Sequence, residues 1–206
     1  MTAVRKRLIQ TYNTDANYHD DKVRINVGAG SHPMEGWVNI DQDPSSGGID
    51  LVADGRDLPY DDGEVEAVYA GHCLEHLTLD EGLVMLKEFA RVVRPGGTVG
   101  ILVPDIREVF RRYLAGTSDI IQYQVHTPRL IRDMRTINDI FVYNHSVATD
   151  EYDSPHRAAY DAPLLVEQLR AAGLEPVAEI DRYDDPRVPV GEWYQFGFDC
   201  EPTEED

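Results

Sequence analysis

The chain has 206 residues, enough for one well-packed α/β domain and short for two. Its 38 acidic and 19 basic residues give a formal net charge of −19. A charge of that sign repels the phosphates of nucleic acid and anionic membrane surfaces at long range, so free nucleic acid and membranes are not expected partners.

The cysteines and the chain ends indicate a cytoplasmic protein. Cys73 and Cys200 lie far apart, do not make a disulfide framework or a thiolate metal site, and suit a reducing interior. No apolar run approaches the roughly 18 residues of a membrane span, and no apolar signal-peptide core follows the first basic residues. We expect an N-terminal arm over residues 1–22 and a solvated acidic tail over residues 199–206.

The stretch from Val23 to Asp41, VRINVGAGSHPMEGWVNID, has the order of a nucleotide site. A β-rich run over residues 23–27 meets a glycine turn, and a second short strand over residues 37–40 ends on Asp41. Glycines let a ligand approach the main chain closely, and a carboxylate at the tip of the next strand can accept hydrogen bonds from a ribose diol. Pro33 and Gly36 leave room for about one turn of helix between the two strands, so the usual helix is truncated or absent.

The rest of the chain alternates strands with helices or loops. The apolar patterns predict strands over residues 49–54, 66–70 and 98–103, a helix over 79–93 that residues 94–97 end, helices over 106–114, 129–142 and 162–172, and an antiparallel pair of strands over 177–183 and 193–198. These elements predict a single-domain Rossmann-like α/β fold, a doubly wound, mostly parallel sheet of seven strands with an antiparallel C-terminal strand. Residues 105–155 form an insertion after the fifth strand and are a candidate lid over the strand ends.

Five sequence motifs in this order resemble the class I S-adenosylmethionine-dependent methyltransferases, in particular small bacterial and phage-type members. They are NVGAGSHP, GWVNID, ADGRDLPYDDGEVEAVY, GHCLEHL and RVVRPGGTV. The resemblance covers residues 23–105 and continues more weakly over residues 156–177. It implies S-adenosyl-L-methionine as the cofactor, S-adenosyl-L-homocysteine as the product and methyl transfer as the activity.

The resemblance also implies which residues of the first two motifs bind the cofactor. Gly28, Ala29 and Gly30 would border its methionine part, and Asp41 would bind its ribose hydroxyls. Asn26 stands two residues before the first glycine, where many members have an acid. An asparagine there can still hydrogen-bond but brings no charge to the cofactor's ammonium group.

In the later motifs the resemblance implies contacts to the adenine and the sulfonium. Asp54 would accept a hydrogen bond from the adenine amino group, the backbone of Gly55 would meet the ring edge, and Arg56 follows in the same loop. Gly71 and His72, at the end of the fourth strand, would pass close to the sulfonium.

A dinucleotide oxidoreductase is the rival nucleotide-binding hypothesis. Its fingerprint requires a third glycine that opens a full helix for the pyrophosphate, with an acid about 20 residues further on. Pro33 stands where that glycine would be needed, and Asp41 follows Gly28 after only thirteen residues. Both features favour a mononucleoside ligand.

Histidines are the candidate general bases if the acceptor is a hydroxyl, because imidazole titrates near neutrality. The candidates are His72, His76, His145 and His156. The string HCLEH at residues 72–76 also matches the H-x-x-E-H pattern of inverted zinc proteases. It follows a buried strand rather than lying within a helix, so we assign no metal to it.

The sequence thus predicts an S-adenosylmethionine-dependent methyltransferase that acts on a small molecule or a glycan-type acceptor. A non-catalytic cofactor-binding or partner protein with the same fold is the alternative from a different class. It is motivated by Asn26 and by His32, which stands where a third glycine is common in the methyltransferase pattern. The acceptor atom and the oligomeric state stay open.

Overall fold

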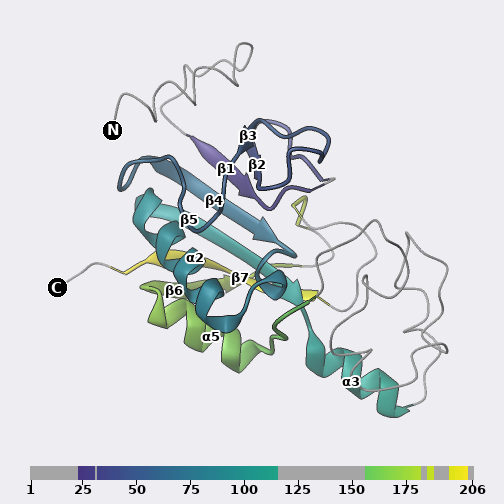
Figure 1. Ribbon diagram of the computed structural model, residues 1–206. Coiled ribbons are helices and arrows are strands. Elements are labelled where there is room, and N and C mark those ends of the chain that lie inside the picture. The colour runs from purple at the N-terminus through teal and green to yellow at the C-terminus, as the bar shows by residue number, and fades with distance from the viewer. Residues whose placement is uncertain (1–22, 31, 116–155, 182–184, 188–194, 204–206) are drawn as a thin grey trace.

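A seven-stranded sheet is the frame of the part of the chain that the structure, a computed structural model, describes: residues 23–30, 32–115, 156–181, 185–187 and 195–203 (Figure 1). The strands are β1 (Arg24–Val27), β2 (Val38–Asp41), β3 (Leu51–Val52), β4 (Val65–Gly71), β5 (Val93–Pro104), β6 (Leu174–Glu179) and β7 (Gln195–Pro202). Their order is β3-β2-β1-β4-β5-β7-β6. Strand β7 is antiparallel to both of its neighbours and every other pair is parallel. This confirms the predicted Rossmann-like fold with an antiparallel C-terminal strand.

The first three strands are short, and the described residues that connect them contain turns rather than helices. The expected loss of the helix between the first two strands is therefore confirmed. Strand β3 has only two residues, fewer than the predicted 49–54. The flanking residues still bind β2, since Asp50 N–H donates to the Asn39 carbonyl at 2.8 Å and Ala53 N–H donates to the Asp41 carbonyl at 3.0 Å. A turn then closes from Asp57 N–H to the Asp54 carbonyl at 3.0 Å.

The segment Arg94–Gly97, RPGG, follows the end of the helix, as expected, but it already belongs to strand β5, which was predicted to begin at residue 98. The helix ends at Val92 and β5 begins at once, with Val93 opposite Val65 and Thr98 opposite Ala67. Six residues of β5, 93–98, therefore face three residues of β4, 65–67, and RPGG forms a bulge within the strand. Gly96 has a φ of 70°, which a residue with a side chain rarely adopts.

Two helices, α2 (Leu79–Val92) and α5 (Ala162–Ala171), cover one face of the sheet (Figure 1). Thr78 and Asp161 begin them by accepting backbone N–H groups of the first turn. Alternate residues of the central strands meet the helices in the main core. The fully buried members of this core include Val68, Val99, Ile101, Val103, Leu86, Phe89, Leu165 and Leu169. This face holds most of the buried apolar area, which drives folding of the domain.

The opposite face of the sheet has a smaller apolar cluster. Tyr69, Leu102 and Ile180 are buried there, and Met34 and Trp37 pack against them. The described residues that cover this face are therefore connecting segments and not helices.

Arg187 makes cation–π and ion-pair contacts on this second face of the sheet. Its guanidinium lies 5.4 Å from the centre of the Tyr69 ring, and it binds Asp199 at 2.7 Å and Asp185. Gly100 makes room for it, because a Cβ at that position would lie 2.7 Å from the guanidinium. Hydrogen bonds from Arg187 hold the pKa of Asp185 below its ordinary value.

The C-terminal strands are displaced from their predicted bounds, and β6 ends at Glu179, before the predicted residue 183. Helix α5 ends before Gly173, whose φ is 79°, and β6 begins at Leu174 instead of residue 177. Strand β7 runs on to Pro202, so the segment expected as an acidic tail starts within the sheet. Cys200 is fully buried in this strand, because apolar packing and strand pairing outweigh the acidic character of the neighbouring sequence.

The insertion after β5 begins with α3 (Ile106–Ala115), which extends away from the sheet (Figure 1). The predicted helix over 129–142, the remaining part of the candidate lid over 116–155 and the arm over 1–22 lie outside the described residues. Among the helices of the described part, none is long and apolar enough to cross a membrane.

Candidate functional site

The loops that follow β1, β2, β3 and β4 leave the sheet at the same edge, because these four strands are parallel neighbours. In folds of this class, ligands bind at this carboxyl edge. The glycine turn, Asp41, Asp54 and the Gly71-His72 pair all lie there, as the strand order places them.

The glycine turn has the backbone that its sequence predicted. Gly28 has a φ of 71°, and a Cβ on it would lie 2.7 Å from the sulfur of Cys73 in the loop after β4. Gly30 has a φ of 50° and donates its N–H to the carboxylate of Asp41 at 2.8 Å. A side chain at either position would force the turn out of this conformation.

Asp41 binds the glycine turn through its carboxylate, and both carboxylate oxygens can still accept a further hydrogen bond. One carboxylate oxygen accepts from Gly30 N–H at 2.8 Å, and the other accepts from Asp43 N–H at 2.9 Å. Each oxygen has about two lone-pair sites, so each can accept one more hydrogen bond, such as one from a diol. The side chain of Asp41 is half-buried, which suits a group that contacts both protein and ligand.

Asn26 binds protein groups instead of lying open to a ligand. It is 4% exposed, and its Nδ2 donates to the carbonyl of His32 at 3.2 Å and to Oδ1 of Asn39 at 3.0 Å. An acid here could not donate these bonds, which gives the departure from the family pattern a physical reason. The structure therefore gives Asn26 a role in positioning the loop.

Asn39 and Asp50 complete this network, and the sequence analysis missed both. Asn39 is 6% exposed, and it accepts from Met34 N–H at 2.7 Å and donates to the Met34 carbonyl at 3.2 Å. Its Nδ2 also donates to Asp50 at 3.1 Å. Little in the sequence indicated Asn39, because it alternates with Val38 and Ile40 as a solvent-facing strand residue would.

Asp54 is held by its own loop. The backbone N–H and the guanidinium of Arg56 bind its carboxylate at 2.7–3.1 Å, and Arg56 also reaches Glu81 at 3.1 Å. The side-chain hydrogen bond from Arg56 lowers the pKa of Asp54. Asp54 thus has fewer free lone pairs for a ligand than Asp41. Gly55 is tightly packed, since a Cβ there would lie 2.8 Å from Val27.

His72 follows Gly71 at the end of β4 and has a φ of 53°, which is rare for a residue with a side chain. Its backbone N–H donates to the Leu102 carbonyl at 2.9 Å. Its Nδ1 lies 3.2 Å from Oε1 of Glu75 and its Nε2 lies 2.7 Å from Oε1 of Gln195. Both ring nitrogens are bound to protein groups, so His72 is better suited to orienting neighbours than to accepting a proton from a substrate.

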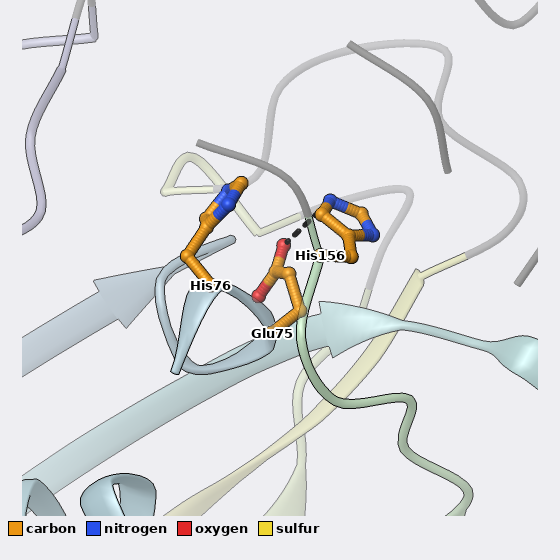
Figure 2. Close-up of side chains that lie close together, drawn as sticks. All are labelled: Glu75, His76 and His156. Carbon is orange, nitrogen blue, oxygen red and sulfur yellow. Dashed lines mark ion pairs between the residues drawn. The ribbon is translucent and has the colours of Figure 1, made fainter. Parts of the chain in front are cut away.

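Glu75, His76 and His156 meet beside His72 (Figure 2). Glu75 and His76 belong to the short 3-10 helix η1 (Leu74–His76), and His156 comes from the segment that leads to α5. The two segments are joined by hydrogen bonds from Arg157 N–H and Ala158 N–H to the Glu75 carbonyl, at 2.7 and 3.1 Å. Of the four histidines predicted as bases, three therefore surround one carboxylate, and His145 lies outside the described residues.

Glu75 is a buried anion, and it is 1% exposed. Burial by itself would raise its pKa, but the hydrogen bond from His72 and the charges of His72, His156 and His76 lower the pKa to about 2. The sequence analysis did not select Glu75, because its partner His156 is distant in sequence. Its place in the HCLEH string was the only available signal.

Comparison with known proteins agrees with this geometry. Residues 33–101 match the family described as "Methyltransferase domain". A solved structure from Pyrococcus horikoshii OT3 aligns with a TM-score of 0.58 at 14% identity, over 97% of this chain and 90% of that one. The fold is that of the class I S-adenosylmethionine-dependent methyltransferases. The resemblance predicted from the five motifs is thereby confirmed.

Two methyltransferase structures show the same likeness. An S-adenosylmethionine-dependent methyltransferase from Clostridium acetobutylicum has a TM-score of 0.55 at 10% identity, over 90% of this chain and 85% of that one. The 1,6-didemethyltoxoflavin-N1-methyltransferase of Burkholderia thailandensis, solved with its substrate and S-adenosylhomocysteine, has a TM-score of 0.51 at 16% identity, over 98% and 79%.

Proposed function

We propose that the protein is an S-adenosylmethionine-dependent methyltransferase that acts on a small molecule or a glycan-type acceptor. The observation that carries the proposal is the pairing of Gly30 N–H with Asp41 at the carboxyl edge of the sheet. It fixes a left-handed glycine turn next to a carboxylate with spare acceptor sites, within a fold that matches known methyltransferases.

The residues fit this cofactor. Gly28 and Gly30 would let its methionine part approach the main chain, and Asp41 would accept from its ribose hydroxyls. Asp54 and the backbone of Gly55 would border the adenine, with Arg56 fixing the carboxylate of Asp54. When bound, the cofactor supplies an electrophilic methyl group on a sulfonium.

The protein's contribution to such a reaction is to align the acceptor and to keep water away. Both ring nitrogens of His72 contact protein groups, so His72 is poorly placed to act as the base toward a hydroxyl acceptor. The net charge of −19 disfavours nucleic acid as the acceptor. A small acceptor also fits the Burkholderia enzyme, whose structure holds a small substrate.

Calorimetry with S-adenosylhomocysteine and, separately, NAD tests the cofactor. We expect saturable binding of S-adenosylhomocysteine and none of NAD. The opposite result would support the dinucleotide oxidoreductase. Incubation of a metabolite extract with cofactor labelled in the methyl group, followed by mass spectrometry, would then identify the acceptor from its labelled product.

A non-catalytic cofactor-binding protein is the second candidate. The absence of an acid at Asn26 and of a third glycine at His32 favours it, because both changes affect the methionine end. Binding of S-adenosylhomocysteine without label transfer to any acceptor pool would support this candidate. A cytoplasmic setting suits either function, since Cys73 and Cys200 are both free thiols.

A further inference from the structure

We infer that Glu75, His76 and His156 form a binding site for a divalent transition-metal ion on the acceptor side of the cofactor site. One ligand atom from each residue can be chosen so that all lie within 4.8 Å of one another. Binding of the ion stands on this cluster alone, whereas its part in the reaction rests on the proposed methyltransferase function.

The spacing is close to that of a bound ion. Two ligand atoms about 2.0–2.1 Å from a zinc ion at a tetrahedral angle are about 3.4 Å apart. Nε2 of His156 lies 4.0 Å from Oε1 of Glu75, and the rings of His76 and His156 meet edge to face with centres 4.9 Å apart. Small side-chain rotations suffice to close these distances, and Figure 2 shows the three side chains converging from two segments.

The buried carboxylate gives a second, independent reason for a cation. Within the described residues, Oε2 of Glu75 is buried and has no hydrogen-bond partner. A buried anionic oxygen without a partner is costly, and a metal ion is one of the few groups that compensates it. The side chain is only 1% exposed, so bulk water does not replace such a partner.

The surroundings orient the ligands as in known metal sites. Nδ1 of His72 contacts Oε1 of Glu75 at 3.2 Å, and its Nε2 contacts the fully buried Gln195 at 2.7 Å. The hydrogen bonds from residues 157 and 158 to the Glu75 carbonyl hold His156 in place. Such outer hydrogen bonds fix the orientation of the ligands and tune the bound ion.

The donor set selects the class of ion. Two imidazoles and one carboxylate suit zinc, manganese or iron(II), whereas magnesium and calcium prefer oxygen ligands. Three protein ligands leave at least one coordination position open. This differs from the protease pattern that the HCLEH string suggested, because Glu75 would be a ligand and His72 would lie outside the ion's ligand set.

Under the proposed function Gly71 and His72 border the sulfonium, and His72 lies 3.2 Å from Glu75, so the open position of the ion would lie beside the methyl group. A hydroxylated acceptor fits such a position. A bound cation lowers the pKa of a hydroxyl that coordinates it, so the proton leaves to solvent and the oxygen becomes nucleophilic. The oxygen then forms a bond to the methyl carbon as the carbon–sulfur bond breaks. Sulfur keeps the electron pair, and the products are a methyl ether and S-adenosylhomocysteine.

The test uses the full chain without a polyhistidine tag, freed of metal with EDTA and titrated by calorimetry with Zn²⁺ and with Mn²⁺. The variants are Glu75→Gln and His156→Ala, and His32→Ala is the control, since His32 is an exposed histidine outside the cluster. Circular dichroism of the same samples shows which variants remain folded, and S-adenosylhomocysteine binding by the wild type is measured separately.

We expect the wild type and His32→Ala to bind one ion per chain. Each cluster variant should bind at least about tenfold more weakly, since loss of even an outer partner of a ligand costs 10–100-fold. A wild type that binds neither ion, or cluster variants that bind as tightly as the wild type, would overturn the site. Failure to bind S-adenosylhomocysteine would instead contradict the proposed function and leave the metal result intact.

Discussion

The half of the sheet formed by β1, β2 and β3 has short strands joined by turns, whereas the half formed by β4, β5, β7 and β6 has longer strands backed by α2 and α5. In the first half, the buried amide of Asn39 and the half-buried carboxylate of Asp50 bind each other and connect the loops. In the second half, apolar side chains of strands and helices interlock.

This difference shows how a cofactor edge can be built with few helices. Hydrogen bonds with fixed geometry position Gly30 and Asp41, while stability comes mainly from the core on the other half. We therefore expect changes in the helical half to reduce stability and spare cofactor binding. Changes in the polar half should affect both.

The largest effect is expected from Phe89→Ala in α2. Phe89 is fully buried, so its loss should lower the free energy of unfolding by about 3–5 kcal/mol. Urea unfolding followed by circular dichroism measures this, with Val84→Ala as the control, since Val84 is 51% exposed in the same helix. Affinity for S-adenosylhomocysteine should be unchanged wherever the variant is folded. A loss below about 1 kcal/mol would contradict this packing.

Asn39→Leu tests the polar half with a side chain of similar size. It removes partners of Asn26, Met34 N–H and Asp50, and each buried polar group left unpaired costs about 1–3 kcal/mol. We expect a total loss of about 2–4 kcal/mol, because the groups relax in part. The affinity for S-adenosylhomocysteine should fall as well.

The control is Val52→Thr, at a 43% exposed position of β3. Unchanged affinity in Asn39→Leu would contradict the expectation that changes in the polar half affect both stability and cofactor binding.

Arg187→Gln tests the charged cluster on the second face and should cost about 2–3 kcal/mol at pH 7. Because Arg187 lowers the folded-state pKa of Asp185, this stabilisation is present above the unfolded pKa and is lost as pH falls through the folded one. The difference in unfolding free energy between the wild type and Arg187→Gln should therefore become smaller below about pH 4. Unfolding curves at several pH values measure this difference.

A difference that becomes larger in acid would contradict the role assigned to Arg187. The control is Arg170→Gln, in an exposed ion pair, which should show no such pH dependence.

Asp41→Ala should weaken S-adenosylhomocysteine binding by about 1.5–3 kcal/mol, or about 10- to 100-fold, because a charge-assisted hydrogen bond is lost and Gly30 N–H loses its partner. Calorimetry measures it. The control is Asp43→Ala, since Asp43 binds Asp41 through its backbone N–H and its own side chain is exposed. An affinity equal to that of the wild type would remove Asp41 from the site.

Features that depend on local sequence were predictable. The left-handed glycines, the truncated connection after β1 and the acids at strand ends follow from residue type and from the period of two in strands. Parallel pairing then brings Asp41, Asp54 and His72 to one edge without further information. Strand bounds were less certain, because the RPGG bulge and the extension of β7 depend on what their partner strands offer.

Short-range patterns were enough to predict the fold class and the glycine turn with its acid at the carboxyl edge of the sheet. The partners of buried polar groups followed only from the packing of the folded chain. The side chains of Asn26 and Asn39, on neighbouring strands, bind each other. Glu75 lies close to His156, although the insertion separates the two residues in sequence. Such pairings depend on the packing of segments that are distant along the chain, and no local pattern records them.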